Sequence, residues 1–95
     1  MLNGKQRRYL RSLANELPSS FQIGKNGLSE DLYKGLNESL RANELIKVSV
    51  LKTCDLTMNE IEVEICANCH CELVQQIGKT IVLYKRSKDN KIILP

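Results

Sequence analysis

Aromatic residues are scarce in this chain, and histidine and long apolar runs are scarce as well. The 95 residues include no Trp, one Phe, three Tyr and one His. Single-stranded bases are commonly bound by stacking on aromatic side chains, so a large stacking platform is not expected. No apolar run approaches the roughly 20 residues that a membrane-spanning helix needs. We expect residues 1–95 to form one small domain with a core of Leu, Ile and Val.

Recognisable catalytic residue sets are missing too. The single histidine lies among cysteines, and no Ser/His/Asp set, paired-carboxylate cleft or phosphate-binding P-loop can be identified. We therefore expect a protein that is not an enzyme and uses no cofactor. The basic N-terminus is not followed by the apolar segment of a secretory signal, which predicts a cytoplasmic protein whose four cysteines are thiols.

Charge is distributed unevenly along the chain, although its net value is only +3. Residues 1–11 carry four basic side chains and no acidic one, and residues 79–95 carry five and one. The segment between them carries five basic and ten acidic side chains. If the fold brings the two ends together, they form a basic patch that can contact several phosphates. The alternative is that the terminal charges only solvate the chain ends.

Apolar periodicity predicts the order helix, strand, helix, strand, helix, strand, strand. The helices are expected at 3–16, 29–43 and 58–69, and the strands at 21–23, 45–51, 72–77 and 80–85, before a tail at 87–95. This order favours an α/β domain, an α+β two-layer sandwich with a four-stranded mixed sheet. Residues 60–65 alternate as in a strand, but their three glutamates favour the helix.

Turn residues mark several of the expected connections. Asn43 is expected to supply the left-handed residue that ends the second helix. Gly78 and Lys79 join the last two strands with Gly first, as a type II′ hairpin turn prefers. Gly35 interrupts the leucine stripe of the second helix and is expected to mark close packing. The apolar residues 92–94 are expected to dock as an extra edge segment of the sheet.

Gly24-Lys25-Asn26-Gly27 joins the strand at 21–23 to the second helix. Two glycines allow positive φ angles and remove side chains that would keep a ligand from the backbone. Ser29 is a good N-cap, so the helix directs free N–H groups and the positive end of its dipole at the same gap. The loop is a candidate phosphate-binding site. Taken alone, such a glycine pair is more often a plain strand-to-helix turn.

Cysteines and the lone histidine gather between residues 66 and 71. Cys66 to His70 formally match the C-x-x-C-H haem-attachment pattern, but haem is attached in compartments that this chain has no signal to reach. A zinc site of Cys66, Cys69, His70 and Cys71 is the alternative, although donors so close in sequence wrap one ion poorly. We expect the cysteines to serve as small apolar residues at a helix end, without metal.

Four segments together resemble one known family. They are KQRRYLR at 5–11, IGKNGL at 23–28, ELIKV at 44–48 and IGKTIVLYKR at 77–86, which span nearly the whole chain. In this order they are similar to the CRM domain, in its stand-alone bacterial YhbY-like form. The resemblance implies a fold similar to the C-terminal domain of translation initiation factor three. It also implies RNA binding, with the bacterial form associated with large-subunit ribosomal precursors and plant relatives with group II intron splicing.

The resemblance implies a set of RNA-binding residues in this chain. The GxxG loop corresponds to Gly24, Lys25, Asn26 and Gly27, the basic first helix to Lys5, Arg7, Arg8 and Arg11, and the closing strand to Gly78, Lys79, Leu83 and Tyr84. The family commonly reads LYR at this end, whereas Lys85 and then Arg86 follow Tyr84 here. Lys85 keeps the charge but lacks the bidentate geometry of Arg. Lys79, Lys85 and Arg86 complete the expected set.

The implied mechanism is contact with the backbone of structured RNA, largely independent of base sequence. The expected partner is ribosomal RNA in a precursor of the large subunit, with neither a membrane nor a small-molecule substrate involved. Two alternatives without RNA contact stay open. One is a small structural-zinc module at residues 66–71, and the other is a protein-interaction module that uses the leucine surfaces or the acidic centre.

Overall fold

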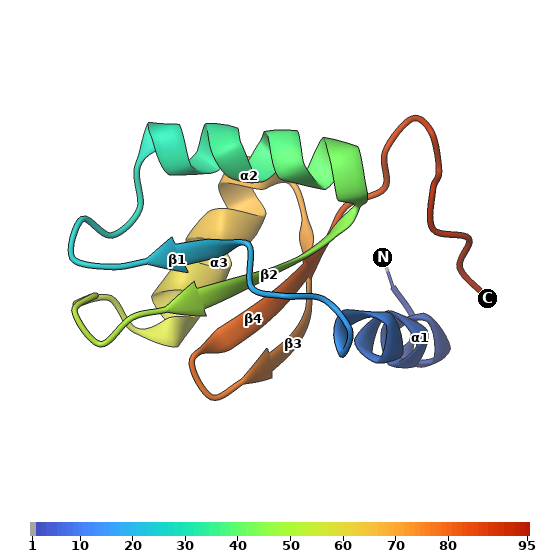
Figure 1. The fold of residues 1–95 in the computed structure, drawn as a ribbon, viewed down its shortest axis with the longest axis horizontal. Helices are drawn as coiled ribbons and strands as arrows, with labels where there is room; N and C mark the ends of the chain where they lie inside the picture. The colour runs from blue at the N-terminus through green and yellow to red at the C-terminus, as the bar shows by residue number, and fades with distance from the viewer. Residues whose placement is uncertain (1) are drawn as a thin grey trace.

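The computed structural model describes residues 2–95, which form three helices around one sheet (Figure 1). The elements are α1 (Gly4–Ala14), β1 (Phe21–Ile23), α2 (Glu30–Asn43), β2 (Leu45–Val50), α3 (Met58–Cys69), β3 (Glu72–Ile77) and β4 (Thr80–Tyr84). The predicted fold class, element order and mixed four-stranded sheet are confirmed, and the ambiguous segment at 58–69 is a helix. Among the described residues, each helix is too short or too polar to span a bilayer.

The sheet has the strand order β1-β2-β4-β3. β1 is parallel to β2, and β4 is antiparallel to both β2 and β3. Parallel neighbours need a crossover connection, which α2 supplies between β1 and β2. α3 carries the chain from β2 past β4 to β3. The carboxyl ends of β1 and β2 therefore lie at the same end of the sheet as the β3–β4 turn, where Gly78 has a φ of 57°.

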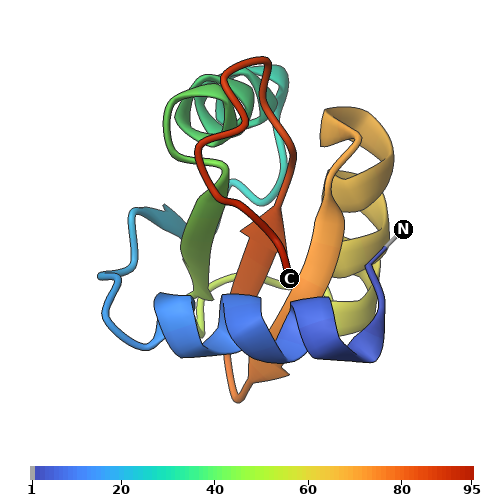
Figure 2. The ribbon, with the colours of Figure 1, turned by 90° about the vertical axis from the view of Figure 1, so that its right-hand side faces the viewer.

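Alternating strand residues divide the core between the two faces of the sheet. On one face, buried residues of β2 and β4 pack with α2 and α3, among them Val48, Ile81, Leu36 and Ile65. On the other face, Leu45, Val82 and Tyr84 pack with Leu10 and Ala14 of α1. Figure 2 shows α1 crossing at the bottom of the sheet, with α2 at the opposite, upper side. α1 thus adds a partial third layer to the predicted sandwich.

The left-handed residue at the end of α2 was predicted to be Asn43 and is instead Glu44, which directly follows the helix. Glu44 has a φ of 66° and is fully buried. A buried carboxylate needs hydrogen-bond donors. The Ser87 N–H and hydroxyl donate to its Oε2 at 2.7 and 2.6 Å, and the Ile92 N–H donates to its Oε1 at 2.6 Å. The prediction was wrong because it considered local turn preference and not a carboxylate that binds residues more than forty positions away.

Glu44 holds the tail against the body of the domain. The Lys85 N–H donates to the Glu44 carbonyl at 2.9 Å, and Lys91 Nζ donates to the Ala42 carbonyl. Ile92 and Leu94 pack on the apolar residues between α1 and the sheet described above, called here the α1 cluster. Ile93 between them is exposed. The segment 92–94 docks, but the prediction of an edge segment was wrong, because these residues pair with no strand.

The charge of Glu44 makes its contribution to stability depend on pH. Burial favours the neutral form, but hydrogen bonds from Ser87, Ile92 and Lys91 outweigh it and hold the pKa of the carboxyl below its ordinary value. A carboxyl with a lowered pKa stabilises the fold above the unfolded value of about 4.3. This contribution is lost as the pH falls through the folded-state pKa.

We predict that Glu44→Gln lowers the free energy of unfolding by about 2 kcal/mol at pH 7, because it removes charge-assisted hydrogen bonds. Urea unfolding measures the loss, and amide exchange at Ser87 and Ile92 should accelerate. The difference between the two proteins should shrink in acid, where the native carboxyl is protonated. Equal stability at pH 7 would show that the carboxylate does not anchor the tail.

Candidate nucleic-acid interface

Residues 24–27, called here the 24–27 loop, form a tight turn between β1 and α2. The Gly27 N–H donates to the Gly24 carbonyl at 2.9 Å, and Gly27 has a φ of 62°, in the left-handed region. Gly24 is required for a different reason. A Cβ at Gly24 would lie 3.3 Å from Thr53 Oγ1 and 3.4 Å from Leu51 Cδ1. The expected freedom of positive φ is used at Gly27, while Gly24 permits close approach of the chain after β2.

Two further connections lie beside the 24–27 loop. The Leu51 N–H donates to the Ile23 carbonyl at 2.8 Å, which places the start of the 51–57 connection against the end of β1. The Val50 N–H donates to the Lys79 carbonyl at 2.7 Å, which brings the β3–β4 turn to the same end. The 24–27 loop and the 51–57 connection project toward the left of Figure 1, and the β3–β4 turn lies at the bottom of that view.

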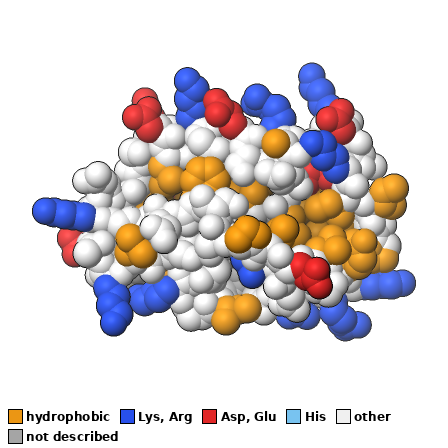
Figure 3. All heavy atoms as spheres, in the orientation of Figure 1, with side chains coloured by type: hydrophobic (Ala, Val, Ile, Leu, Met, Phe, Trp, Pro, Cys, Tyr) orange, Lys and Arg blue, Asp and Glu red, His pale blue; other side chains and the backbone are white. Residues whose placement is uncertain are grey.

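Each of these connections carries one exposed lysine, namely Lys25, Lys52 and Lys79. We call these three lysines and the 24–27 loop the loop surface. Figure 3 shows Lys or Arg side chains at this left-hand end, with others along the top and at the lower right. Lys52 was missed by the sequence predictions. The available signal was its position directly after the second strand, because the carboxyl ends of parallel neighbouring strands share one edge of a sheet.

The start of α2 contributes less positive potential than its dipole alone suggests. Glu30 and Asp31 occupy its first turn, and carboxylates there offset the positive end of the helix. The Ser29 Oγ, as predicted for the N-cap, accepts the Leu32 N–H at 3.1 Å. The attraction of the loop surface for an anion must therefore come mainly from its lysines and its glycine backbone.

The basic residues of α1 lie at the other end of the sheet. α1 packs beside Leu45, where β2 begins, and Tyr84, where β4 ends. Lys5, Arg8 and Arg11 are exposed there. Arg7 is different, because its Nη1 donates to the Leu73 carbonyl at 2.6 Å. Arg7 thus belongs to the packing of α1 on β3 rather than to a free basic face.

The two chain ends come together, which is the condition that the expected basic patch required. Gln6 Nε2 donates to the Pro95 carbonyl at 3.4 Å, and Ile92 and Leu94 pack on the α1 cluster. Helix α1 and the C-terminus lie toward the right of Figure 1, whereas the 24–27 loop lies toward the left. The structure therefore separates the basic chain ends from the 24–27 loop by the length of the sheet.

A polar strip of the sheet joins these two regions. On the face that α1 partly covers, Lys47 and Ser49 follow Leu45 along β2 toward the loop surface. Gln22 and Thr80 are the register partners of Ser49 on the two neighbouring strands. Cross-strand partners share a face, so the four polar residues lie together between α1 and the loop surface.

The last two expected residues, Lys85 and Arg86, lie outside the loop surface. They border a cavity of about 570 Å³ between the C-terminal half of α2 and the tail, and they also line a pocket with Leu2 and Gln6 at the start of α1. The 24–27 loop precedes the opposite end of α2. The structure thus distributes the expected RNA-binding residues over the loop surface, the exposed face of α1 and this cavity.

The donors at residues 66–71 do not converge. Cys69 Sγ donates to the Tyr33 carbonyl at 3.8 Å, and Cys71 Sγ donates to the Ile65 carbonyl at 3.9 Å. His70 is exposed and ends α3 in the left-handed conformation. A hydrogen bond between the thiols lowers the pKa of Cys66 and raises that of Cys71. In residues 2–95, no three or more His, Cys, Asp or Glu side chains are grouped to hold a metal ion.

Comparison with known proteins gives consistent matches over the whole chain. The CRS1 / YhbY (CRM) domain family model matches residues 2–85. The chain is 50% identical over 93 residues to the probable RNA-binding protein YqeI of Bacillus subtilis, covering 98% of this chain and 97% of that protein. It is 36% identical over 94 residues to an RNA-binding protein of Haemophilus influenzae, covering 99% and 95%. The solution structure of a Staphylococcus aureus protein matches with a TM-score of 0.83 and 47% identity, covering 100% of both chains.

We predict that Arg7→Gln and Arg8→Gln, two neighbouring changes with the same loss of charge, differ in their effect on stability. Arg7→Gln removes the hydrogen bond to the Leu73 carbonyl and should cost about 1 to 2 kcal/mol. Arg8→Gln alters an exposed side chain and should stay within about 0.5 kcal/mol of the native protein. Chemical denaturation measures both. Equal effects would show that Arg7 has no structural role.

Proposed function

This chain belongs to the CRS1/YhbY (CRM) domain family, and from that premise we propose that it is an RNA-binding protein that contacts the backbone of structured RNA. The observation that carries the proposal is the loop surface, where Lys25, Lys52 and Lys79 meet beside a glycine-bounded turn. The names of the relatives from Bacillus subtilis and Haemophilus influenzae, both RNA-binding, support the same partner.

The proposed contact starts at the 24–27 loop. Gly24 and Gly27 carry no side chain, so a phosphate can approach the backbone of this turn closely. Lys25, Lys52 and Lys79 then act as point charges around it, each with rotatable donors. Contacts of this kind position a protein on a nucleic acid without reading its bases.

The RNA backbone continues from the loop surface along the polar strip to α1. Lys47 lies on that strip, and Lys5, Arg8 and Arg11 are exposed beyond it. The domain measures 37 Å along its longest axis, so separate phosphates would occupy the two ends of this path. With four aromatic residues in the chain, base stacking is a minor part of the binding. Affinity should therefore depend steeply on salt and weakly on base sequence.

The finer proposal is that the RNA is ribosomal RNA in a precursor of the large subunit, and that the protein acts in ribosome assembly. It is supported by the family resemblance of the segments at 5–11, 23–28, 44–48 and 77–86. Crosslinking in cells followed by sequencing of the attached RNA tests it. Large-subunit precursor sequences should dominate, and a library dominated by messenger RNA would contradict the assignment.

We predict that Lys25→Glu weakens binding to a structured RNA by about tenfold or more and flattens the dependence of log Kd on log salt. Its thermal midpoint should hardly move, because the Lys25 side chain is exposed. Fluorescence anisotropy with a labelled RNA hairpin measures the affinity.

Lys34→Glu is the matched control for this experiment. Lys34 is exposed on α2, one turn from both Glu30 and Glu38, so acidic neighbours already offset its charge. Its reversal should change the affinity less than about threefold, since the side chain lies outside the loop surface. Unchanged affinity in Lys25→Glu, or an equal loss in Lys34→Glu, would contradict the proposed role of the loop surface.

A further inference from the structure

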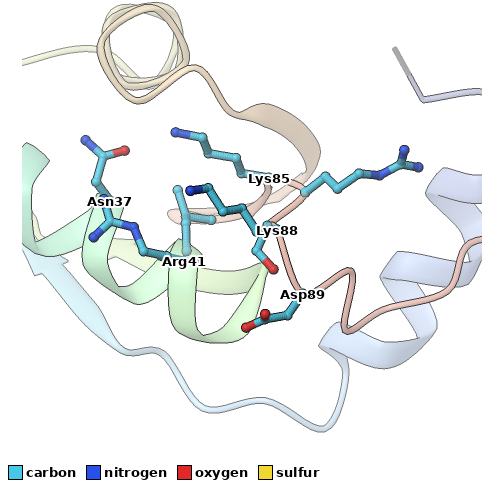
Figure 4. Close-up of a pocket in the computed structure, with 8 residues that line it drawn as sticks. Asn37, Arg41, Lys85, Lys88 and Asp89 are labelled. Carbon is cyan, nitrogen blue, oxygen red and sulfur yellow. The ribbon is translucent and has the colours of Figure 1, made fainter.

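The cavity beside the tail is strongly basic. Its lining comes from Asn37, Leu40 and Arg41 of α2 and from residues 85–89. Four lining residues are basic, and Asp89 supplies one carboxylate against Arg41, Lys85, Arg86 and Lys88. Figure 4 shows Lys85 and Lys88 extending their amino groups toward Asn37 and Arg41 on the opposite wall. Cations from two separate segments thus face one space.

The wall formed by the tail is held in place by neutral donors. Ser87, in the middle of this wall, binds the Glu44 carboxylate through both its N–H and its hydroxyl. The C-terminal end of α2, which is the negative end of its dipole, has its own cationic partner, because Lys91 Nζ donates to the Ala42 carbonyl. Lys85 and Lys88 are therefore carried on a fixed segment and not on a free chain end.

Asn37 adds a polar atom that the chain does not satisfy. Its Oδ1 is buried, and within residues 2–95 it has no hydrogen-bond partner. A buried acceptor without a donor is costly, so a ligand that brings a donor would be favoured. In RNA, each phosphate is next to a ribose whose 2′-hydroxyl can donate, and DNA lacks that group.

We propose that this cavity binds one ribose-phosphate unit of an RNA backbone. Arg41, Lys85 and Lys88 contact the phosphate, and Asn37 accepts a hydrogen bond from the 2′-hydroxyl. The inference rests on the proposed RNA-binding function and adds to it a further contact point, which also favours RNA over DNA.

The cavity and the loop surface hold different phosphates. α2 rises about 1.5 Å per residue, so Arg41 lies about 16 Å along the helix axis from Glu30, which follows the 24–27 loop. Each additional phosphate contact releases further counterions and steepens the dependence of affinity on salt. The two contact points therefore make separable contributions to binding.

The test compares Lys88→Gln with Lys34→Gln, which remove one positive charge from exposed lysines inside and outside the cavity. A labelled RNA hairpin is titrated by fluorescence anisotropy between about 50 and 200 mM KCl. Lys88→Gln should weaken binding about fivefold and reduce the slope of log Kd against log salt by about 1. Lys34→Gln should stay within about twofold of the native protein, since its charge lies outside the cavity.

Lys25→Glu in the same titration separates the two proposals. If the native protein binds, Lys25→Glu weakens it and Lys88→Gln matches Lys34→Gln, the cavity proposal is overturned and the proposed function stands. If the native protein does not bind the hairpin, both proposals are overturned. If Lys25→Glu leaves the affinity unchanged, the role of the loop surface is overturned, and the comparison of Lys88→Gln with Lys34→Gln alone decides the cavity proposal.

Asn37→Ala tests the hydroxyl contact with an RNA hairpin and a DNA hairpin of the same sequence. The ratio of the two affinities should fall about threefold or more, because the alanine cannot accept from the 2′-hydroxyl. The thermal midpoint of the variant is measured to show that it folds. An unchanged ratio in a folded variant overturns the contact between Asn37 and ribose.

Discussion

The parallel pairing of β1 with β2 is the contact on which the loop surface depends. Its register aligns Ile23 with Val50, so both strands end at one edge, and the Leu51 N–H extends the ladder to the Ile23 carbonyl. β1 has only three residues, and two side chains secure it. Ile23 is buried in the core, and the Phe21 ring lies where a Cβ at Gly35 would meet it at 3.3 Å. The expectation that Gly35 marks close packing is thereby confirmed.

The opposite end of the molecule depends on the buried carboxylate of Glu44. The tail is polar over residues 87–91, and of its three consecutive apolar residues Ile93 is exposed while Ile92 and Leu94 are only partly buried, so its packing alone would hold it weakly. Glu44 fixes it through Ser87 and Ile92, and the tail then completes both the α1 cluster and the basic cavity. In the proposed complex Glu44 does not contact the nucleic acid. It positions the basic residues of the tail that do contact it. A surface for a polyanion is arranged here by a carboxylate inside the fold.

Local pattern was enough to predict the elements, because each strand and helix carries its own periodicity. The leucine stripe and Ser29 cap defined α2, and the glycines of the 24–27 loop and of the β3–β4 turn defined their turns. The alternating pattern of residues 60–65 does not place every apolar side chain on one face of a helix, and in α3 Val63 is 58% exposed. The partial third layer had a signal that was not used. Residues 81–84 are all apolar, which is typical of a strand buried on both faces.

The candidate site was harder to predict, because it depends on which distant residues meet. Lys52 joins the loop surface through strand pairing, and Arg7 leaves the basic face through a contact with Leu73 that helical periodicity cannot reveal. Family resemblance implied RNA contacts for Lys85 and Arg86 at the end of the closing strand, and the structure places them beside the C-terminal half of α2. The sequence was enough to name most of the basic residues of the candidate interface. The fold decides which of them can contact the same stretch of RNA.

Amide chemical-shift mapping with an RNA hairpin tests the central claim most directly, because it reports on every part of the surface at once. The account predicts the largest changes at residues 24–27, at Lys52 and at Gly78 and Lys79. Further changes are expected along Lys47, on the exposed face of α1 and at the cavity residues 85–89. The acidic outer face of α3, with Glu60 and Glu64, should be unaffected. Changes confined to α3 and the outer face of α2, with the 24–27 loop silent, would contradict the account.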